Sequence, residues 1–218
     1  MKKIVISGLL FMVVVGNAFA QAAEPETVFD YVPDKYVYIN LDVNSPMANK
    51  GWLDATTARG VKAGYRQFLS RSFSAGVDIG YASFNQYFPT ETFQYPNGAL
   101  TTDYFNYISS LSVVLSGQYN FQLKSQLFYP YVGIGLGAMG NDYTTYYNIY
   151  TDKDTSWGFL ARPEAGVLIR LSKRRAIGGM AGIHYDYSTN ESEKNGYSNF
   201  SSIGFQVGIM FMDWKFGY

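Results

Sequence analysis

The sequence has no cysteine, one histidine and few charged residues. Without cysteine it has no disulfide, no thiolate nucleophile and no cysteine-based metal site. Charged residues make up 16% of its 218 residues and the formal net charge is zero. It therefore lacks the basic surplus of a nucleic-acid-binding protein, and we expect no nucleic-acid partner. After residue 20 it also lacks an apolar run near the ~20 residues of a membrane-spanning helix. A membrane form of the mature chain must cross as strands.

The first 20 residues have the pattern of a secretory signal peptide. Lys2 and Lys3 provide a basic start, residues 4–15 are apolar, and Ala18-Phe19-Ala20 is a cleavage site of the A-x-A type. We expect cleavage after Ala20. Residues 21–34 are polar and contain two prolines, which predicts a periplasmic N-terminal lead-in before a barrel over residues 35–218.

The stretch Phe128 to Gly140 (FYPYVGIGLGAMG) alternates with the period of a strand. One face carries aliphatic side chains and the other carries mostly glycine. A soluble sheet shows charge on its outer face, whereas a glycine face beside an aliphatic face suits a narrow barrel whose outside contacts lipid. The aromatic content of 18% agrees with this hypothesis. A soluble lipocalin-like barrel needs the reverse pattern, with an apolar interior and a polar exterior.

The same alternation predicts an all-β fold, an eight-stranded antiparallel up-and-down transmembrane β-barrel. The expected strands are 36–43, 60–69, 73–84, 105–121, 128–140, 157–171, 176–187 and 200–218. Short turns alternate with four long loops, 44–58, 85–103, 141–156 and 188–199, which predicts short turns and both termini on the periplasmic side. Pro163 predicts a bulge. A parity slip near Gly208 predicts a second bulge, with Met210 and Met212 facing outward.

The charged residues on the inward parity predict a charge network in the lumen. Its members are Asp42, Lys62, Arg66, Asp78, Arg162, Glu164, Arg170, His184, Asp186, Asp213 and Lys215. An unpaired buried charge costs several kcal/mol, so we expect these residues to pair. The interior of an eight-stranded barrel is just wide enough to be filled by side chains, which favours a plugged lumen over a small pore.

No catalytic, cofactor-binding or metal-binding residue is predicted. His184, Asp186 and Ser188 share a face and suggest a triad, but residues four apart on a strand lie ~13 Å apart, so His184 reaches Asp186 and not Ser188. Gly135, Gly137 and Gly140 spell G-x-G-x-x-G without the helix that a nucleotide-binding turn requires. The alternative that remains open is a barrel enzyme that modifies lipid A through His184.

The segments PYVGIGLG and LARPEAGV and the terminal WKFGY resemble the eight-stranded outer membrane protein family that includes the outer membrane protein A transmembrane domain and outer membrane protein X. The likeness covers about residues 35–218. It implies a Gram-negative outer membrane location and recognition by the outer membrane assembly machinery through Trp214, Phe216 and Tyr218. In the lipid A deacylases, another eight-stranded family, a serine stands two residues after the histidine, where this sequence has Asp186.

The predicted long loops are rich in Tyr, Asn, Ser and Thr, the mixture found in binding loops. We therefore expect a non-enzymatic, monomeric barrel in contact with outer membrane lipids and lipopolysaccharide. It has a structural role in the envelope and offers its loops for surface contact or adhesion. The loop composition also fits strand extensions that face lipopolysaccharide sugars, and the sequence does not separate these two interpretations.

Overall fold

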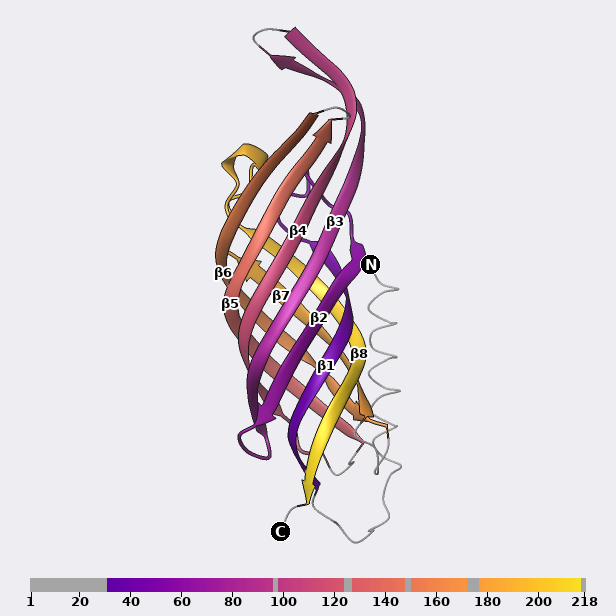
Figure 1. Cartoon of the computed structure of the whole chain (residues 1–218), viewed down its shortest axis with the longest axis vertical. Coiled ribbons are helices and arrows are strands. Elements are labelled where there is room, and N and C mark those ends of the chain that lie inside the picture. The colour runs from indigo at the N-terminus through magenta and orange to yellow at the C-terminus, as the bar shows by residue number, and fades with distance from the viewer. Residues whose placement is uncertain (1–30, 96–97, 124–126, 148–149, 172–176, 217–218) are drawn as a thin grey trace, which may run out of the picture.

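The computed structural model describes residues 31–95, 98–123, 127–147, 150–171 and 177–216. Eight antiparallel strands follow one another around a closed barrel, in which β1 pairs with both β2 and β8 (Figure 1). Within these described ranges, no helix is long and apolar enough to cross a membrane. The predicted fold class, an eight-stranded up-and-down barrel, is confirmed. The predicted signal peptide and most of the lead-in lie outside the described residues.

The longest connections between strands are those after β1 and after β7, and the other strands follow one another more closely. Their bounds are β1 Tyr31–Pro46, β2 Thr57–Phe68, β3 Phe73–Tyr95, β4 Gly98–Asn120, β5 Phe128–Tyr147, β6 Tyr150–Arg170, β7 Ile177–Ser188 and β8 Phe200–Phe216. One short helical turn, η1 Glu193–Asn195, lies between β7 and β8 and ends at Gly196, whose φ of 69° is left-handed. We call the end at which β2 leads into β3, β4 into β5 and β6 into β7 the short-turn end. The opposite end, where β3 leads into β4 and β5 into β6, is the hairpin end.

The side chains alternate between the outside and the lumen as predicted. On β5, Ile134 and Leu136 are 57% and 48% exposed, whereas Tyr131 and Met139 are 1% and 3% exposed. Gly133, Gly135 and Gly137 of β5 face inward, and a side chain has no room at Gly137, where a Cβ would lie 2.0 Å from the carbonyl oxygen of Val113. The glycine face therefore lets adjacent strands and lumen side chains approach closely.

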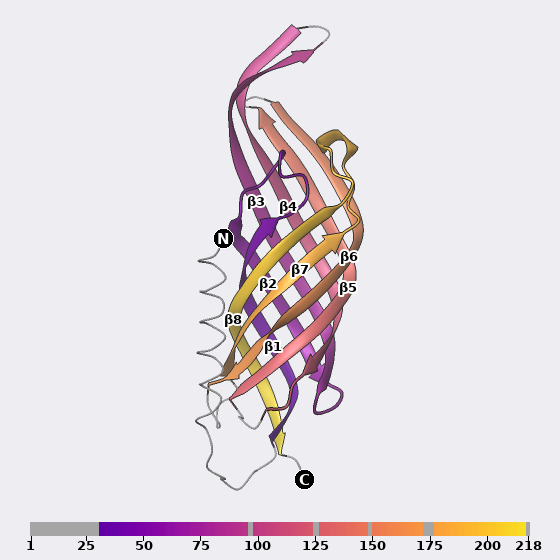
Figure 2. The same cartoon turned by 180° about the vertical axis from the view of Figure 1, so that it is seen from behind.

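Two of the predicted loops, 85–103 and 141–156, are largely strand. The β3–β4 hairpin and the β5–β6 hairpin continue beyond the rest of the sheet, and the β3–β4 hairpin projects furthest (Figures 1 and 2). Tyr, Thr and Phe favour strands, and directly opposed side chains support the extension. Phe88 and Tyr104 stack at 4.9 Å, and the hydroxyls of Thr92 and Thr101 are 2.9 Å apart. The loop bounds predicted for these two segments are therefore wrong, because both segments extend the strands.

Both predicted bulges are wrong. Pro163 pairs in register with Ile134 of β5, and the register between β6 and β7 is the same on both sides of it. The proline lacks an N–H, and the ladder to β7 skips residues 162 and 163 instead of shifting. On β8, Met210 and Met212 are 0% and 2% exposed and face the lumen, so the parity does not slip at Gly208. Strand β8 also pairs with β1, and the register of that pair shifts on β1, between residues 33 and 35.

Candidate functional site

The lumen is the candidate site, because the strands direct nearly all the predicted ionisable side chains into it. Every described member of the predicted charge network is at most 6% exposed: Asp42, Lys62, Arg66, Asp78, Arg162, Glu164, Arg170, His184 and Asp186. Their inward direction follows from the two-residue period of the strands. The side chains of Asp213 and Lys215, and those of the proposed assembly signal, Trp214, Phe216 and Tyr218, lie outside the described residues.

One bidentate ion pair in the network joins Arg66 of β2 to Asp78 of β3. The Arg66 guanidinium donates two parallel hydrogen bonds to the carboxylate, and the Nη2–Oδ2 distance is 2.7 Å. Asp78 also accepts hydrogen bonds from the hydroxyls of Tyr38 and Ser116. This bidentate geometry is the strong form of an ion pair, and it fixes two adjacent strands from inside the barrel.

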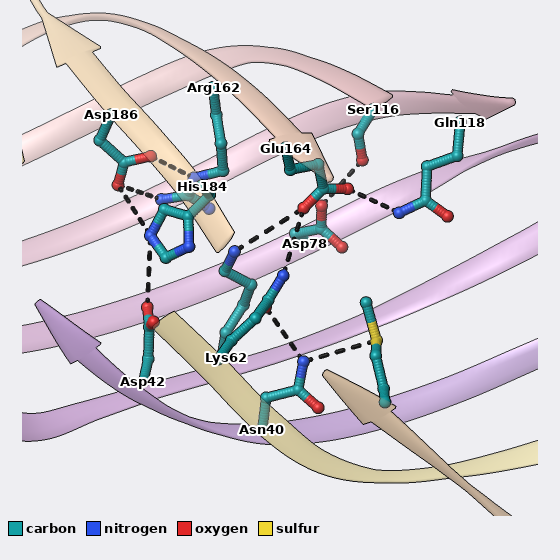
Figure 3. Close-up of polar contacts among 12 residues, drawn as sticks. Asn40, Asp42, Lys62, Asp78, Ser116, Gln118, Arg162, Glu164, His184 and Asp186 are labelled. Atoms are coloured by element: carbon teal, nitrogen blue, oxygen red, sulfur yellow. Dashed lines mark hydrogen bonds and ion pairs between the residues drawn. The ribbon is translucent and has the colours of Figure 1, made fainter. Parts of the chain in front are cut away.

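Glu164 of β6 connects this pair to the opposite wall, and Figure 3 shows its contacts with Lys62 and Gln118. Its carboxylate accepts a hydrogen bond of 2.6 Å from Gln118 Nε2, and it lies 3.5 Å from Arg66 Nη2 and 3.9 Å from Lys62 Nζ. One buried carboxylate is therefore shared by two cations. The sharing compensates charges that are costly to bury.

A second ion pair lies closer to the hairpin end, where Arg162 Nη2 donates to Asp186 Oδ2 at 2.7 Å. His184 Nε2 lies 3.8 Å from Asp186 Oδ2 and 3.5 Å from Asp42 Oδ2, so the imidazole stands between two carboxylates (Figure 3). Ser188 Oγ donates instead to the carbonyl oxygen of Phe200 at 3.4 Å. The three residues of the suggested triad therefore do not form a catalytic chain.

Above the charges, an apolar group that we call the mouth cluster closes the hairpin end. It comprises Leu53, Phe84, Ile108, Val114, Met139, Tyr143, Leu160, Tyr197 and Phe200. Leu53 and Tyr197 come from the segments after β1 and β7, which fold over the opening and are joined by a hydrogen bond of 2.7 Å from Asn49 Nδ2 to the carbonyl oxygen of Asn195. Burial raises the pKa of Tyr143 to about 12, so its phenol stays protonated at neutral pH.

Below the charges, a second group fills the short-turn end, and we call it the floor cluster. It comprises Tyr36, Tyr38, Tyr131, Leu168, Met180, Met210 and Met212. Met210 and Met212 contribute here, which explains why an outward assignment based on hydrophobicity was wrong. The lumen thus consists of an apolar mouth, a charged middle and a mainly apolar floor. Arg170 lies at the end of β6, beyond Leu168 of the floor cluster, so the structure does not bring it together with the charged middle.

A small cavity of about 20 Å³ remains between the charged middle and the mouth cluster. Its lining includes Arg162, Asp186, Ser110, Phe84 and Phe200. A buried water needs roughly 10–15 Å³, so this space accommodates about one water molecule and no organic substrate. In the described part of the chain, no group of three or more His, Asp or Glu side chains is placed to hold a metal ion.

Sequence reasoning missed the uncharged polar residues that complete the network. Tyr36 donates to Gln118 Oε1 at 2.7 Å, and Asn40 Nδ2 donates to Gln206 Oε1 at 3.0 Å. These side chains share the inward parity of the charges. The inward parity alone was the signal that could have identified them.

A closed barrel with apolar outer side chains and a charged, filled interior defines the class of eight-stranded membrane barrels. The chain belongs to the outer membrane protein beta-barrel domain family, whose sequence profile matches residues 7–211. Membership of this family supports an outer membrane location. No curated protein matches the chain at a significant level.

Two solved structures share the fold. Neisserial surface protein A is 15% identical, with a TM-score of 0.58, and the match covers 82% of this chain and 97% of that one. Ail, the attachment invasion locus protein of Yersinia pestis, is 11% identical with a TM-score of 0.51, and the match covers 84% of this chain and 99% of that one. At these identities the likeness establishes the fold alone.

Proposed function

We propose that this protein is a non-enzymatic, monomeric outer membrane barrel that strengthens the envelope and presents its hairpin end for surface contact. The observation that carries the proposal is the filled lumen, in which the mouth cluster, the charge network and the floor cluster follow one another along the barrel. The cavity between the charged middle and the mouth cluster has room for about one water molecule, which supports a closed interior with a structural role.

The ion pairs suit a structural role better than a catalytic one. Each described carboxylate of the network lies within 4 Å of a cation or of His184. The contacts of Glu164 join β6 to β2, and the contact of His184 with Asp42 joins β7 to β1, so these contacts connect strands that are not neighbours in the sheet. Cross-lumen pairs of this kind resist deformation of a narrow barrel. Ail is the attachment invasion locus protein of Yersinia pestis, and attachment is the finer role that we propose here for the hairpin end.

The contact role can be tested by trimming the β3–β4 hairpin. Phe88 and Tyr104 are directly paired, so replacing residues 89–103 with Asn-Gly closes the strands with a two-residue turn and keeps the mouth cluster intact. We expect the trimmed protein to fold, as judged by its heat-dependent gel mobility, and cells that carry it to lose adherence or autoaggregation. Unchanged contact by folded trimmed protein would contradict the role of this hairpin.

The non-enzymatic part is tested through His184. We expect lipid A mass spectra to be identical in cells with the wild-type protein, with His184→Asn and without the gene, because the imidazole is enclosed by Asp42 and Asp186. An acyl chain that is lost or added only in the presence of wild-type protein would establish a lipid A modifying activity. Export by residues 1–20 and assembly through the C-terminal strand remain parts of this proposal.

A further inference from the structure

The strand register arranges the outward side chains of β3 to β6 in rows that run across the sheet. The row that ends the apolar surface is Tyr81, Leu111, Gly140 and Trp157. The next row toward the hairpin end is Ser83, Ser109, Asp142 and Thr155, followed by Asn85, Tyr107, Thr144 and Lys153, and then by Tyr87, Phe105, Tyr146 and Thr151. We call the last two rows the ring platform.

The ring platform exposes aromatic side chains beyond the apolar band, where a water-exposed protein surface is normally polar. Tyr87, Phe105 and Tyr146 are 52%, 38% and 45% exposed. The rings form a continuous series, in which the centroids are 5.0 Å apart for Tyr87 and Phe105, 6.4 Å apart for Phe105 and Tyr107, and 5.3 Å apart for Tyr107 and Tyr146. Exposed apolar groups that are contiguous mark contact sites more often than scattered ones do.

Polar groups border these rings. Arg59 of β2 donates to Asn85 Oδ1 at 3.3 Å, and Lys153 lies 3.0 Å from Asp142 at the other side of the platform. Tyr107 and Thr144, which are directly opposed in the sheet and each carry a hydroxyl, lie between these two ends. Flat rings beside hydroxyl, amide and cationic groups can stack on the C–H faces of a sugar and exchange hydrogen bonds with its hydroxyls.

The height of the platform selects the kind of lipid that can reach it. Its rows follow the end of the apolar surface by four and six residues, or roughly 13 and 20 Å along strands that tilt by about 45°. They therefore stand about 9 and 14 Å above the hydrocarbon, whereas phospholipid head groups add only about 5–8 Å per side. A head group made of several sugars extends that far.

We infer that the ring platform binds the saccharide head group of outer-leaflet lipopolysaccharide, which surrounds the barrel at this height. The occupant follows from continuity, because the platform continues the lipid-facing side of β3 to β6 on the same parity. The inference rests on the outer membrane placement in the proposed function and gives one of its surfaces a ligand. It is independent of whether the lumen is closed or the β3–β4 hairpin mediates adherence.

The hairpin itself offers a matched control for the test. Tyr87 and Phe105 are directly opposed on the outward face, and Phe88 and Tyr104 are directly opposed on the other face of the same two strands. Each pair contains one tyrosine and one phenylalanine, with ring centroids 5.0 and 4.9 Å apart. The double variants Tyr87→Thr with Phe105→Thr, and Phe88→Thr with Tyr104→Thr, therefore remove equal ring area from opposite faces.

The experiment measures binding of full-length protein in detergent to two probes, lipopolysaccharide with its core sugars and lipid A without them. We expect the outward variant to bind the core-bearing probe about tenfold more weakly, a loss of the size seen when contributing interface side chains are truncated, and to bind lipid A like wild type. The inner-face variant should bind both probes like wild type. Heat-dependent gel mobility confirms that each variant is folded.

Three results would overturn the inference. Equal binding of wild type and the outward variant excludes the rings as a sugar contact. Equal weakening for both probes assigns the rings to an ordinary membrane girdle, and equal weakening by both double variants assigns the effect to the shape of the hairpin. None of these results affects the closed lumen, which bilayer conductance reports separately.

Discussion

Replacing Asp78 with asparagine should destabilise the barrel more than any single change at its surface. The side chains of Arg66 and Asp78 are 0% and 1% exposed, and two hydrogen bonds join them. Hydrogen bonds to charged groups contribute about 1.5–3 kcal/mol each, and breaking a buried ion pair costs about 3–5 kcal/mol. Glu164, 3.5 Å from Arg66, offsets part of the lost charge. We therefore expect the free energy of unfolding to fall by about 3 kcal/mol.

The assay is urea unfolding of the refolded protein in lipid vesicles, followed by tryptophan fluorescence and by heat-dependent gel mobility. The matched control is Asp142→Asn, which breaks an ion pair with Lys153 whose side chains are 40% and 56% exposed. An exposed pair contributes less than about 1 kcal/mol. A loss for Asp78→Asn no greater than the loss for Asp142→Asn would refute a stabilising role for the lumen network.

Two further changes test the packing of the barrel. Gly137→Ala should prevent correct assembly, because its Cβ would lie 2.0 Å from the carbonyl oxygen of Val113. The control Gly117→Ala, whose Cβ has its nearest contact at 3.4 Å, should fold normally. Heat-dependent gel mobility after refolding measures the folded yield, and equal yields for the two variants would contradict the prediction. Leu53→Ala, at a side chain with 0% exposure, should cost about 2–5 kcal/mol of local packing and speed hydrogen exchange over residues 47–56. Unchanged exchange there would show that the mouth does not depend on this side chain.

The alternation of side chains was sufficient to predict the barrel and the direction of most charges. A two-residue period assigns each residue to a face without any knowledge of the neighbouring strands. The alternation did not predict which of the charged side chains form ion pairs with one another. Arg66 and Asp78 are diagonal neighbours in the pairing of β2 with β3. Arg66 and Glu164 meet across the lumen, and no local sequence pattern encodes a contact between strands so far apart in the sequence.

Hydrophobicity misled the prediction where the lumen itself is apolar. Met210 and Met212 resemble lipid-facing residues in composition, yet they complete the floor cluster. Similarly, the segments rich in Tyr, Asn and Thr were assigned to loops because their polarity resembles that of loops. Cross-strand stacking, such as that of Phe88 on Tyr104, extends the strands through them.

Single-channel recording in planar lipid bilayers tests the central claim, that the lumen is closed, most directly. The mouth cluster and the floor cluster bracket a charge network in which the described carboxylates are paired. The account predicts that inserted wild-type protein gives no discrete conductance steps under an applied voltage. Reproducible steps that scale with salt concentration would contradict it and would establish a water-filled path through the barrel.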